Sequence, residues 1–311
     1  MKQRTLTALF IAIVVISAFL LREVNTIIFD ALFCLVIVIS ANEVARVFNR
    51  SGRLNDSLII TVYPILNYIL FFFCLNANMN IWLIFLLSIG LILFLMLIET
   101  IIVLSTRKTL KTEFEKFKTT KTFSEFCLNK ILLTGFIMLY PALLLSSLYY
   151  FNHILDFKYL ELATKFEGFN LSLFLLLITI VTTVATDIFA YLIGSAIKGP
   201  KLCPLISPNK TISGAIGGLL GGIVCGFGVY GIFMAFGLTE VLIPIYLIII
   251  YTILASIVSQ VGDIFASVIK RKARTKDYSS IFPGHGGFMD RLDGISFNAL
   301  FSLIFFMLFI L

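Results

Sequence analysis

Residues 80–104 read NIWLIFLLSIGLILFLMLIETIIVL, and this stretch decides the class of fold. Only one of its side chains, that of Glu99, is ionisable. A helix of about 20 apolar residues crosses a hydrocarbon core of about 30 Å. Because unpaired backbone polar groups are costly in lipid, a segment that crosses it has to be helical. The stretch therefore predicts a transmembrane helix.

Similar apolar runs recur along the whole chain. The 311 residues are 59% hydrophobic and 13% charged, whereas a soluble domain has roughly a quarter of charged residues. The sequence therefore predicts an all-α fold, a polytopic integral membrane helix bundle with about nine transmembrane helices. The predicted spans are 5–21, 24–45, 57–75, 80–104, 131–151, 169–193, 213–236, 241–261 and 294–311.

The basic residues indicate the orientation of the bundle. When the connections between the nine spans are assigned alternately to two sides, one side receives 21 Lys and Arg residues and the other receives three. The positive-inside rule then predicts a cytoplasmic N-terminus. The net charge of +7 is explained by this topology and by attraction to anionic lipid headgroups, so we expect no nucleic-acid partner.

We expect two regions along the chain. Residues 1–130 form an N-terminal transmembrane region of four spans, followed by an amphipathic cytoplasmic segment at 105–130. Residues 131–311 form a C-terminal catalytic transmembrane region, with cytoplasmic loops at 194–213 and 262–293.

Two sequence patterns argue against other classes of site. The five cysteines are scattered singly, which suggests neither a zinc site nor a disulfide framework. GFGVYG at 226–231 has the spacing of a dinucleotide fingerprint but lies inside a predicted span, without the strand that such a site needs. Glycines spaced by four along this span instead predict close packing against another helix. These glycines are Gly214, Gly218, Gly222 and Gly226.

Three carboxylates lie inside or beside the first four spans. Asp30 and Glu99 are interpreted as side chains that are paired within the bundle or lie near an interface. Glu43 lies toward the cytoplasmic end of its span, closer to other polar groups, and is kept as a weak functional candidate.

Polar residues gather where the sixth span ends. DIFAYLIG at 187–194 places Asp187, Tyr191 and Gly194 on one helical face. Residues 198–213 contain three prolines, which forbid a regular helix, and three lysines. Lysine side chains, together with the hydroxyl groups at 211–213, suit phosphate oxygens. An ordinary positive-inside loop explains this stretch equally well.

The eighth span ends in a polar stripe. Ser256, Gln260, Asp263, Ser267 and Lys270 follow one another at intervals of four and three residues. This spacing keeps them on one face of a continuing helix. Asp263 is therefore expected at the mouth of a polar cavity.

Residues 276–293 add carboxylates, cations and a glycine turn, PGHGG at 283–287. Glycines let the backbone pass close to a ligand. Several carboxylates without thiolates suit Mg²⁺, which shares its coordination shell with substrate phosphates. Such a set is what phosphoryl or nucleotidyl transfer requires. The alternative, a loop whose acids and bases only pair with one another, explains fewer of these features.

The stretch from Ser267 to Asp293 resembles the signature of the phosphatidate cytidylyltransferases, also called CDP-diacylglycerol synthases. DIFAYLIG and KLCPLISPNKT resemble a second block of that family, except that Ser213 stands where the family usually has Glu. Glu43 matches a family Glu at the end of the second span. The signature positions are Ser267, Ile269, Lys270, Arg271, Lys276, Asp277, Ser279, Phe282, Pro283, His285, Gly286, Gly287, Phe288, Asp290, Arg291, Leu292 and Asp293.

The resemblance implies that CTP and phosphatidic acid react to give CDP-diacylglycerol and pyrophosphate with Mg²⁺, a second cation being left open. It implies Asp263 and Asp290 as metal ligands, with Asp293 supporting them or orienting Arg291. His285 would contact phosphate, act as an acid toward pyrophosphate or fix the turn. Phosphates would be held by Lys270, Arg271, Lys276, Arg291, Ser207, Lys210 and Thr211. The remaining candidates are Asp277 for catalysis and Asp187, Tyr191, Lys201, Ser267, Gly286 and Gly287 for substrate binding.

We expect the protein in a bacterial inner membrane, with the active site facing the cytoplasm. Two alternatives remain open. One is a CTP-dependent transferase that acts on another lipid phosphate, such as an isoprenoid or ether lipid. The other is an ion-coupled transporter, for which the expected inverted repeats are not visible. A homodimer is also left open.

Overall fold

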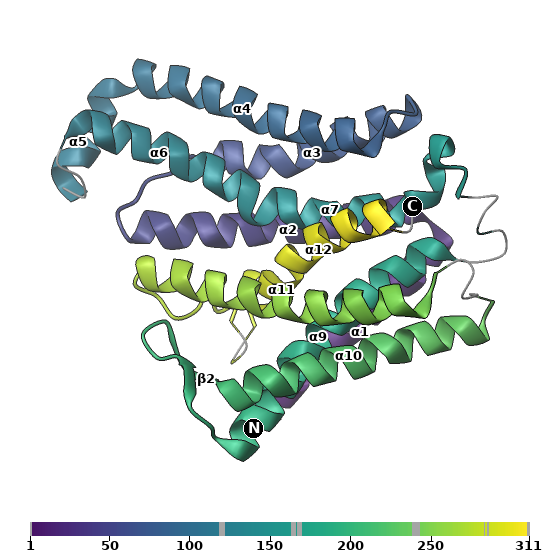
Figure 1. Cartoon of the computed structure of the whole chain (residues 1–311). Coiled ribbons are helices and arrows are strands. Elements are labelled where there is room, and N and C mark those ends of the chain that lie inside the picture. Colours follow the sequence, from purple (N-terminus) through teal and green to yellow (C-terminus); the bar gives the residue numbers. More distant parts are fainter. Residues whose placement is uncertain are drawn as a thin grey trace. The chain divides into compact units, whose positions relative to one another are not determined.

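The computed structural model (Figure 1) describes residues 2–117, 122–162, 166, 170–237, 243–282, 284 and 286–309, with the side chains of residues 2–12 excepted. The helices before residue 145 are α1 (Lys2–Val24), α2 (Thr26–Arg50), α3 (Ser57–Asn76), α4 (Ile81–Ser105), α5 (Arg107–Phe117), α6 (Phe123–Ile137) and the π-helix η1 (Met138–Leu143). The later helices are α7 (Leu144–Asn152), the short 3₁₀ turns η2 (Ile154–Asp156) and η3 (Lys158–Leu160), α9 (Leu171–Ile197), α10 (Ile212–Ala235), α11 (Ile245–Lys272) and α12 (Met289–Phe309).

Eight helical segments within the described residues are long and apolar enough to cross a membrane. They coincide with the last eight predicted spans, and the first predicted span falls within α1. The predicted all-α polytopic bundle is therefore confirmed. The count of nine spans and the cytoplasmic N-terminus stay predictions.

The chain forms two compact units. Unit 1 comprises Met1–Ser146 and Lys272–Asp290, and unit 2 comprises Ser147–Arg271 and Arg291–Leu311. This division differs from the predicted boundary near residue 130. It also assigns residues 272–290, which were expected in the C-terminal region, to the unit that contains the first four spans.

In unit 1, polar side chains mark the points where helices begin. Asn25, Asp56 and Asn80 accept hydrogen bonds from the first backbone N–H groups of α2, α3 and α4, groups that have no partner inside the helix. The core side of α2 carries fully buried residues at intervals of three and four, as expected for a helix packed on one face. α2 packs against α1 and α3, and α4 packs against α3 and α6.

The predicted amphipathic segment at 105–130 divides into two parts. Arg107–Phe117 forms α5, whereas residues 123–130 belong to α6. The Thr122 side chain accepts a hydrogen bond from the N–H of Glu125 at 3.2 Å and so begins this helix. The long helix is interrupted at η1, which contains Pro141, because proline lacks the N–H that a regular helix needs.

In unit 2, the predicted loop 194–213 contains a β-hairpin. β1 (Lys201–Cys203) pairs antiparallel with β2 (Ser207–Thr211), and Lys201 lies opposite Thr211. The three prolines do exclude a helix here, but Pro208 is compatible with a two-stranded ribbon, in which every strand is an edge strand. The interpretation of this stretch as irregular was wrong.

The second predicted loop, 262–293, is shorter than expected. α11 continues to Lys272 and α12 begins at Met289, so that Asp263 is helical and Asp290 lies in the first turn of α12. The helical position of Asp263 confirms the continuing helix that the spacing from Ser256 to Lys270 predicted. The first turn of α12 was expected in the loop because its residues are polar. Their polar side chains nevertheless lie on helix ends that extend beyond the apolar part of each span.

The glycines of α10 pack against α9, and the two helices lie side by side (Figure 1). A Cβ atom added at Gly214 or Gly218 would lie 2.7 Å from a carbonyl oxygen of α9, that of Ala190 or Thr186 respectively. Only glycine permits so close an approach of two helix backbones. The predicted packing role of these glycines is confirmed.

Candidate active site

Charged side chains from four elements of unit 2 converge. Asp187 of α9 interacts electrostatically with Asp263 of α11, with Asp293 and Arg291 of α12, and with Lys210 of β2. The ammonium group of Lys210 lies 2.5 Å from the carboxylate of Asp263. Three carboxylates and two cations, far apart in the sequence, thus form one polar cluster, which we call the unit 2 cluster.

Two residues of the predicted signature link neighbouring elements of unit 2. The Lys270 ammonium lies 3.9 Å from Asp293, which is almost fully buried. Arg271 donates a hydrogen bond from Nε to the carbonyl oxygen of Ile206 at 3.1 Å, which ties the end of α11 to the β-hairpin. The hairpin that carries Lys210 on β2 is therefore fixed to α11 at its turn.

Thr211 and Ser213 fix the beginning of α10. The Thr211 hydroxyl accepts from the N–H of Gly214 at 3.0 Å and lies 3.1 Å from the Ser213 hydroxyl. Ser213 also accepts from the N–H of Gly199 at 3.2 Å. At the position where the resembled family usually has Glu, this chain therefore has a hydroxyl that joins two ends of the 198–213 connection.

The other predicted substrate-binding residues of unit 2 differ in exposure. Tyr191 is 75% exposed, on the same helix as Asp187. Lys201 is exposed and Ser207 is half-buried on the hairpin. Ser267 is buried on α11 and is thus the least accessible of the four. Exposure alone leaves their roles as predictions.

In unit 1, Asp290 closes the turn that precedes α12. Its Oδ2 accepts hydrogen bonds from the backbone N–H of Tyr278 at 2.8 Å and of Gly287 at 2.9 Å. Within this turn Gly286 has φ +82° and its carbonyl oxygen accepts from the N–H of Phe282 at 2.8 Å. The positive φ is the reason why glycine is required at position 286.

Glu43 of α2 contacts the turn that precedes α12. From α2 its carboxylate accepts hydrogen bonds from the Ser279 hydroxyl at 2.6 Å, from the N–H of Phe288 at 3.1 Å and from the N–H of Met289 at 2.8 Å. Its side chain is almost fully buried. Two signals in the sequence pointed to Glu43: its place at the cytoplasmic end of a predicted span and its match to a Glu of the resembled family.

Within the described part of the turn, two signature residues, Lys276 and Asp277, have no side-chain contact that assigns them a role. Lys276 and Asp277 are exposed. The carbonyl oxygen of Asp277 accepts from the Thr275 hydroxyl at 2.9 Å. His285, like Pro283, lies outside the described residues, and its predicted role stays a prediction.

The predicted metal ligands can be tested only by the chemistry of their donors. No group of three or more His, Cys, Asp or Glu side chains in the described part of the chain could hold a metal ion. Mg²⁺, however, is commonly bound by one or two carboxylates plus substrate phosphates, and Asp263 and Asp290 supply oxygen donors of that kind. Asp263 belongs to unit 2 and Asp290 to unit 1.

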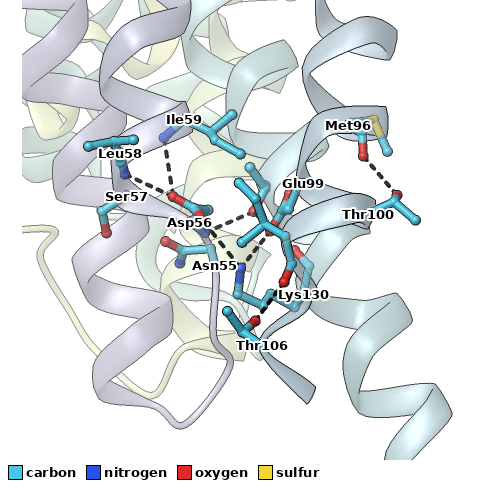
Figure 2. Close-up of polar contacts among 12 residues, drawn as sticks. Asn55, Asp56, Ser57, Leu58, Ile59, Met96, Glu99, Thr100, Thr106 and Lys130 are labelled. Atoms are coloured by element: carbon cyan, nitrogen blue, oxygen red, sulfur yellow. Dashed lines mark hydrogen bonds and ion pairs between the residues drawn. The ribbon is translucent and has the colours of Figure 1, made fainter. Parts of the chain in front are cut away.

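A second buried polar cluster in unit 1 surrounds Lys130. Its ammonium lies 2.8 Å from Glu99, which is fully buried, and 3.5 Å from Asp56 (Figure 2). The Thr134 hydroxyl donates to Glu99 at 2.9 Å and accepts from the N–H of Asp56 at 3.0 Å. The interpretation of Glu99 as a paired structural carboxylate is confirmed. Asp30, which accepts from the Tyr68 hydroxyl at 2.9 Å, is paired as well.

A cavity of about 450 Å³ adjoins Lys130. None of the residues proposed from the sequence as catalytic or substrate-binding lines it, so we do not assign it to the active site. Its lining residues are Phe48, Arg53, Leu54, Glu125, Phe126, Asn129, Lys130, Leu132, Leu133 and Phe136.

The fold and the charged helix ends define the class of protein: an integral membrane protein with carboxylates and cationic side chains at the ends of its last spans. More particularly, the chain belongs to the cytidylyltransferase family, whose pattern it matches along residues 2–309. The predicted family is thereby confirmed.

Curated relatives have narrower names. Over 111 residues the chain is 43% identical to the phosphatidate cytidylyltransferase of Brucella abortus biovar 1, which covers 36% of this chain and 38% of that protein. Over 143 residues it is 36% identical to the phosphatidate cytidylyltransferase of Staphylococcus saprophyticus, covering 46% of this chain and 51% of the relative. The matched stretch thus spans about two fifths of the Brucella relative's length and about half of the Staphylococcus relative's length.

Proposed function

We propose that this protein is a phosphatidate cytidylyltransferase, which converts CTP and phosphatidic acid into CDP-diacylglycerol and pyrophosphate. The observation that carries the proposal is the match of the cytidylyltransferase family along residues 2–309. The names of the Brucella and Staphylococcus relatives support phosphatidate as the lipid substrate.

The reaction we propose joins a phosphate of the lipid to the nucleotide. An oxygen of the phosphatidate phosphate attacks the α-phosphorus of CTP, and the bond from that phosphorus to the bridging oxygen of pyrophosphate breaks. A phosphate nucleophile is already largely ionised at neutral pH, so no general base is required. The task of the protein is then positioning and electrostatic stabilisation.

The unit 2 cluster supports this proposal. Lys210 and Arg291 bring positive charge to a place where two carboxylates of other helices are already present. The Lys210 ammonium pairs with Asp263. We propose that phosphate oxygens compete for this ammonium and release the Asp263 carboxylate for other ligands.

Mg²⁺ is part of the proposal. When bound, it would offset the negative charge of the phosphates. Asp263 of unit 2 and Asp290 of unit 1 are each proposed as a metal ligand, because each supplies the hard oxygen donors that Mg²⁺ prefers. We also propose a second cation, a homodimer, a location in the bacterial inner membrane and an active site that faces the cytoplasm.

The test is release of pyrophosphate by the purified full-length protein with CTP, Mg²⁺ and phosphatidic acid in detergent or liposomes. We expect release only when all three are present. A folded preparation that releases none with phosphatidic acid would contradict the proposal. Release with an isoprenoid phosphate or an ether-linked acid, and not with phosphatidic acid, would favour the alternative lipid substrate.

Asp290→Asn is the matching variant. Asparagine keeps one side-chain oxygen, which can still accept from the N–H groups of Tyr278 and Gly287, so mainly the negative charge is removed. We expect turnover to be abolished while membrane insertion stays normal, since the hydrophobicity of the spans is unchanged. Near-normal activity would show that the proposed metal role of Asp290 is wrong.

A further inference from the structure

Glu43 occupies an unusual environment for a carboxylate. It is 1% exposed, and the three hydrogen bonds described above come from one hydroxyl and two backbone N–H groups. Hydrogen bonds to a charged acceptor are roughly twice as strong as those between neutral groups. A buried carboxylate without such donors would be costly. Loss of the carboxylate would in turn leave the three donors without their acceptor.

The donors of these bonds belong to a segment far away in the sequence. Ser279, Phe288 and Met289 are 236 to 246 residues from Glu43. Met289 is the first residue of α12, and the first N–H groups of a helix have no partner within it. The helix dipole also places partial positive charge at this end. Glu43 therefore acts as a cap for α12 that is supplied by another helix.

The capped turn carries candidate catalytic residues. Asp290 follows Met289 directly, and Asp290 in turn accepts from the N–H groups of Tyr278 and Gly287. Glu43 thus accepts from residues 279, 288 and 289, and Asp290 accepts from residues 278 and 287. Any movement of the turn away from Glu43 therefore displaces the backbone that orients the Asp290 carboxylate.

The geometry points to Glu43 as a positioning residue for nucleotidyl transfer, one that fixes the 279–289 turn and the first turn of α12 and so orients Asp290. This inference rests on the proposed function for its catalytic part. Its structural part, that Glu43 fixes the turn, is independent of which reaction the protein performs.

Glu43→Gln tests both parts. Glutamine has nearly the same shape, but its amide presents N–H donors where the carboxylate had an acceptor, and its charge is lost. We expect amide hydrogen exchange in residues 276–289 to become roughly tenfold faster or more, because loss of bonds to a charged acceptor favours local opening. We expect kcat to fall roughly ten- to a hundredfold, with a smaller change in KM for CTP.

Asp30→Asn is the matched control. Asp30 is a fully buried carboxylate on the same helix α2, and it accepts from the Tyr68 hydroxyl. It precedes Glu43 by 13 residues, which is roughly 20 Å along the helix at about 1.5 Å per residue. We expect exchange in residues 276–289 and kcat to be the same as in the unchanged protein, which would separate the loss of Glu43 from the loss of any buried carboxylate in α2.

Ser279→Ala provides a second variant if Glu43→Gln does not fold. It removes one of the three bonds and leaves the charge and both backbone bonds in place. We expect faster exchange in residues 276–289 and a lower kcat, each at roughly a third to a tenth of the size expected for Glu43→Gln.

Three outcomes are decisive. Unchanged exchange in both variants would show that Glu43 does not fix the turn. Faster exchange with unchanged kcat would show that Glu43 stabilises the turn without positioning catalytic groups, and would overturn the inference. If the unchanged protein itself releases no pyrophosphate, the proposed function fails, whereas the exchange measurement still decides whether Glu43 fixes the turn.

Discussion

Glu43 and Glu99 are both buried carboxylates of unit 1, and both lie within predicted spans, yet their charges are compensated differently. Glu99 pairs with the ammonium of Lys130. Glu43 instead accepts from one hydroxyl and two backbone N–H groups of the turn before α12. The first arrangement joins two transmembrane helices, and the second joins a transmembrane helix to a candidate catalytic turn.

The difference shows why a charge inside a span does not by itself mark a functional site. Carboxylates in membrane spans are functional candidates by default because they are costly there. The partner decides which of them is structural. A cation on a neighbouring helix neutralises Glu99, whereas backbone donors from a turn that carries further charged residues are the reason why we propose a functional role for Glu43.

The largest expected effect is that of Lys130→Met. Removing one partner of a buried ion pair leaves the other charge uncompensated, which costs about 3–5 kcal/mol. We expect the free energy of unfolding in detergent micelles to fall by that amount, while turnover per folded molecule stays unchanged. Lys108→Met, at an exposed lysine of α5, is the control. A loss of turnover that exceeds the loss of folded protein would mean that the Glu99 pair is not merely structural.

Gly287→Ala tests the other side of the comparison. A Cβ atom at this position would overlap both carboxylate oxygens of Glu43 and lie 2.5 Å from the Ser279 hydroxyl. Such overpacking costs about 1–3 kcal/mol, and we expect the turn to move, with loss of turnover. Gly90→Ala, where nothing lies within 4 Å of the added atom, should keep full turnover. Equal turnover of the two variants would show that a displacement of the turn does not affect catalysis.

Thr134→Val has a smaller expected effect. It removes the hydroxyl that donates to Glu99 and accepts from the N–H of Asp56. Because Asp56 is partly exposed, its N–H can be hydrated, and the expected loss is about 1 kcal/mol in the free energy of unfolding. Urea or detergent titration would measure it. A loss as large as that of Lys130→Met would indicate that the hydroxyl, and not the ammonium, is the main partner of Glu99.

The sequence predicts the spans well because membrane crossing depends on local hydropathy. Glu99 and Lys130 are 31 residues apart, on predicted neighbouring elements, so their pairing was within reach of sequence reasoning. The bonds of Glu43 were not, because its partners are more than 200 residues away and two of them are backbone N–H groups. Every residue except proline has such a donor, so no residue type marks it.

The β-hairpin and the first turn of α12 were missed for another physical reason. Prolines in 198–213 excluded a helix, but the choice between an irregular loop and two short strands depends on pairing, such as that of Lys201 with Thr211. The continuation of α11 through Asp263 to Lys270 was predicted from residue spacing. Polar residues at 289–293 suggested a loop, since hydropathy marks where a span leaves the apolar phase and not where its helix begins. The candidate residues were therefore found by type, whereas their contacts required the structure.

The smallest expected effect is that of a double substitution, Glu99→Met with Lys130→Met. Replacing both members of a buried ion pair by apolar residues of similar size is often neutral or stabilising, and the remaining partner, Asp56, is exposed enough to be hydrated. We expect the double variant to unfold within about 1 kcal/mol of the unchanged protein and to keep its turnover, measured by the same titration and by pyrophosphate release. No comparable rescue exists for Glu43, because its backbone donors cannot be replaced by side-chain substitution. A double variant as unstable as Lys130→Met alone would show that Glu99 and Lys130 stabilise the protein by more than compensation of each other's charge. The distinction between Glu99 and Glu43 would then fail.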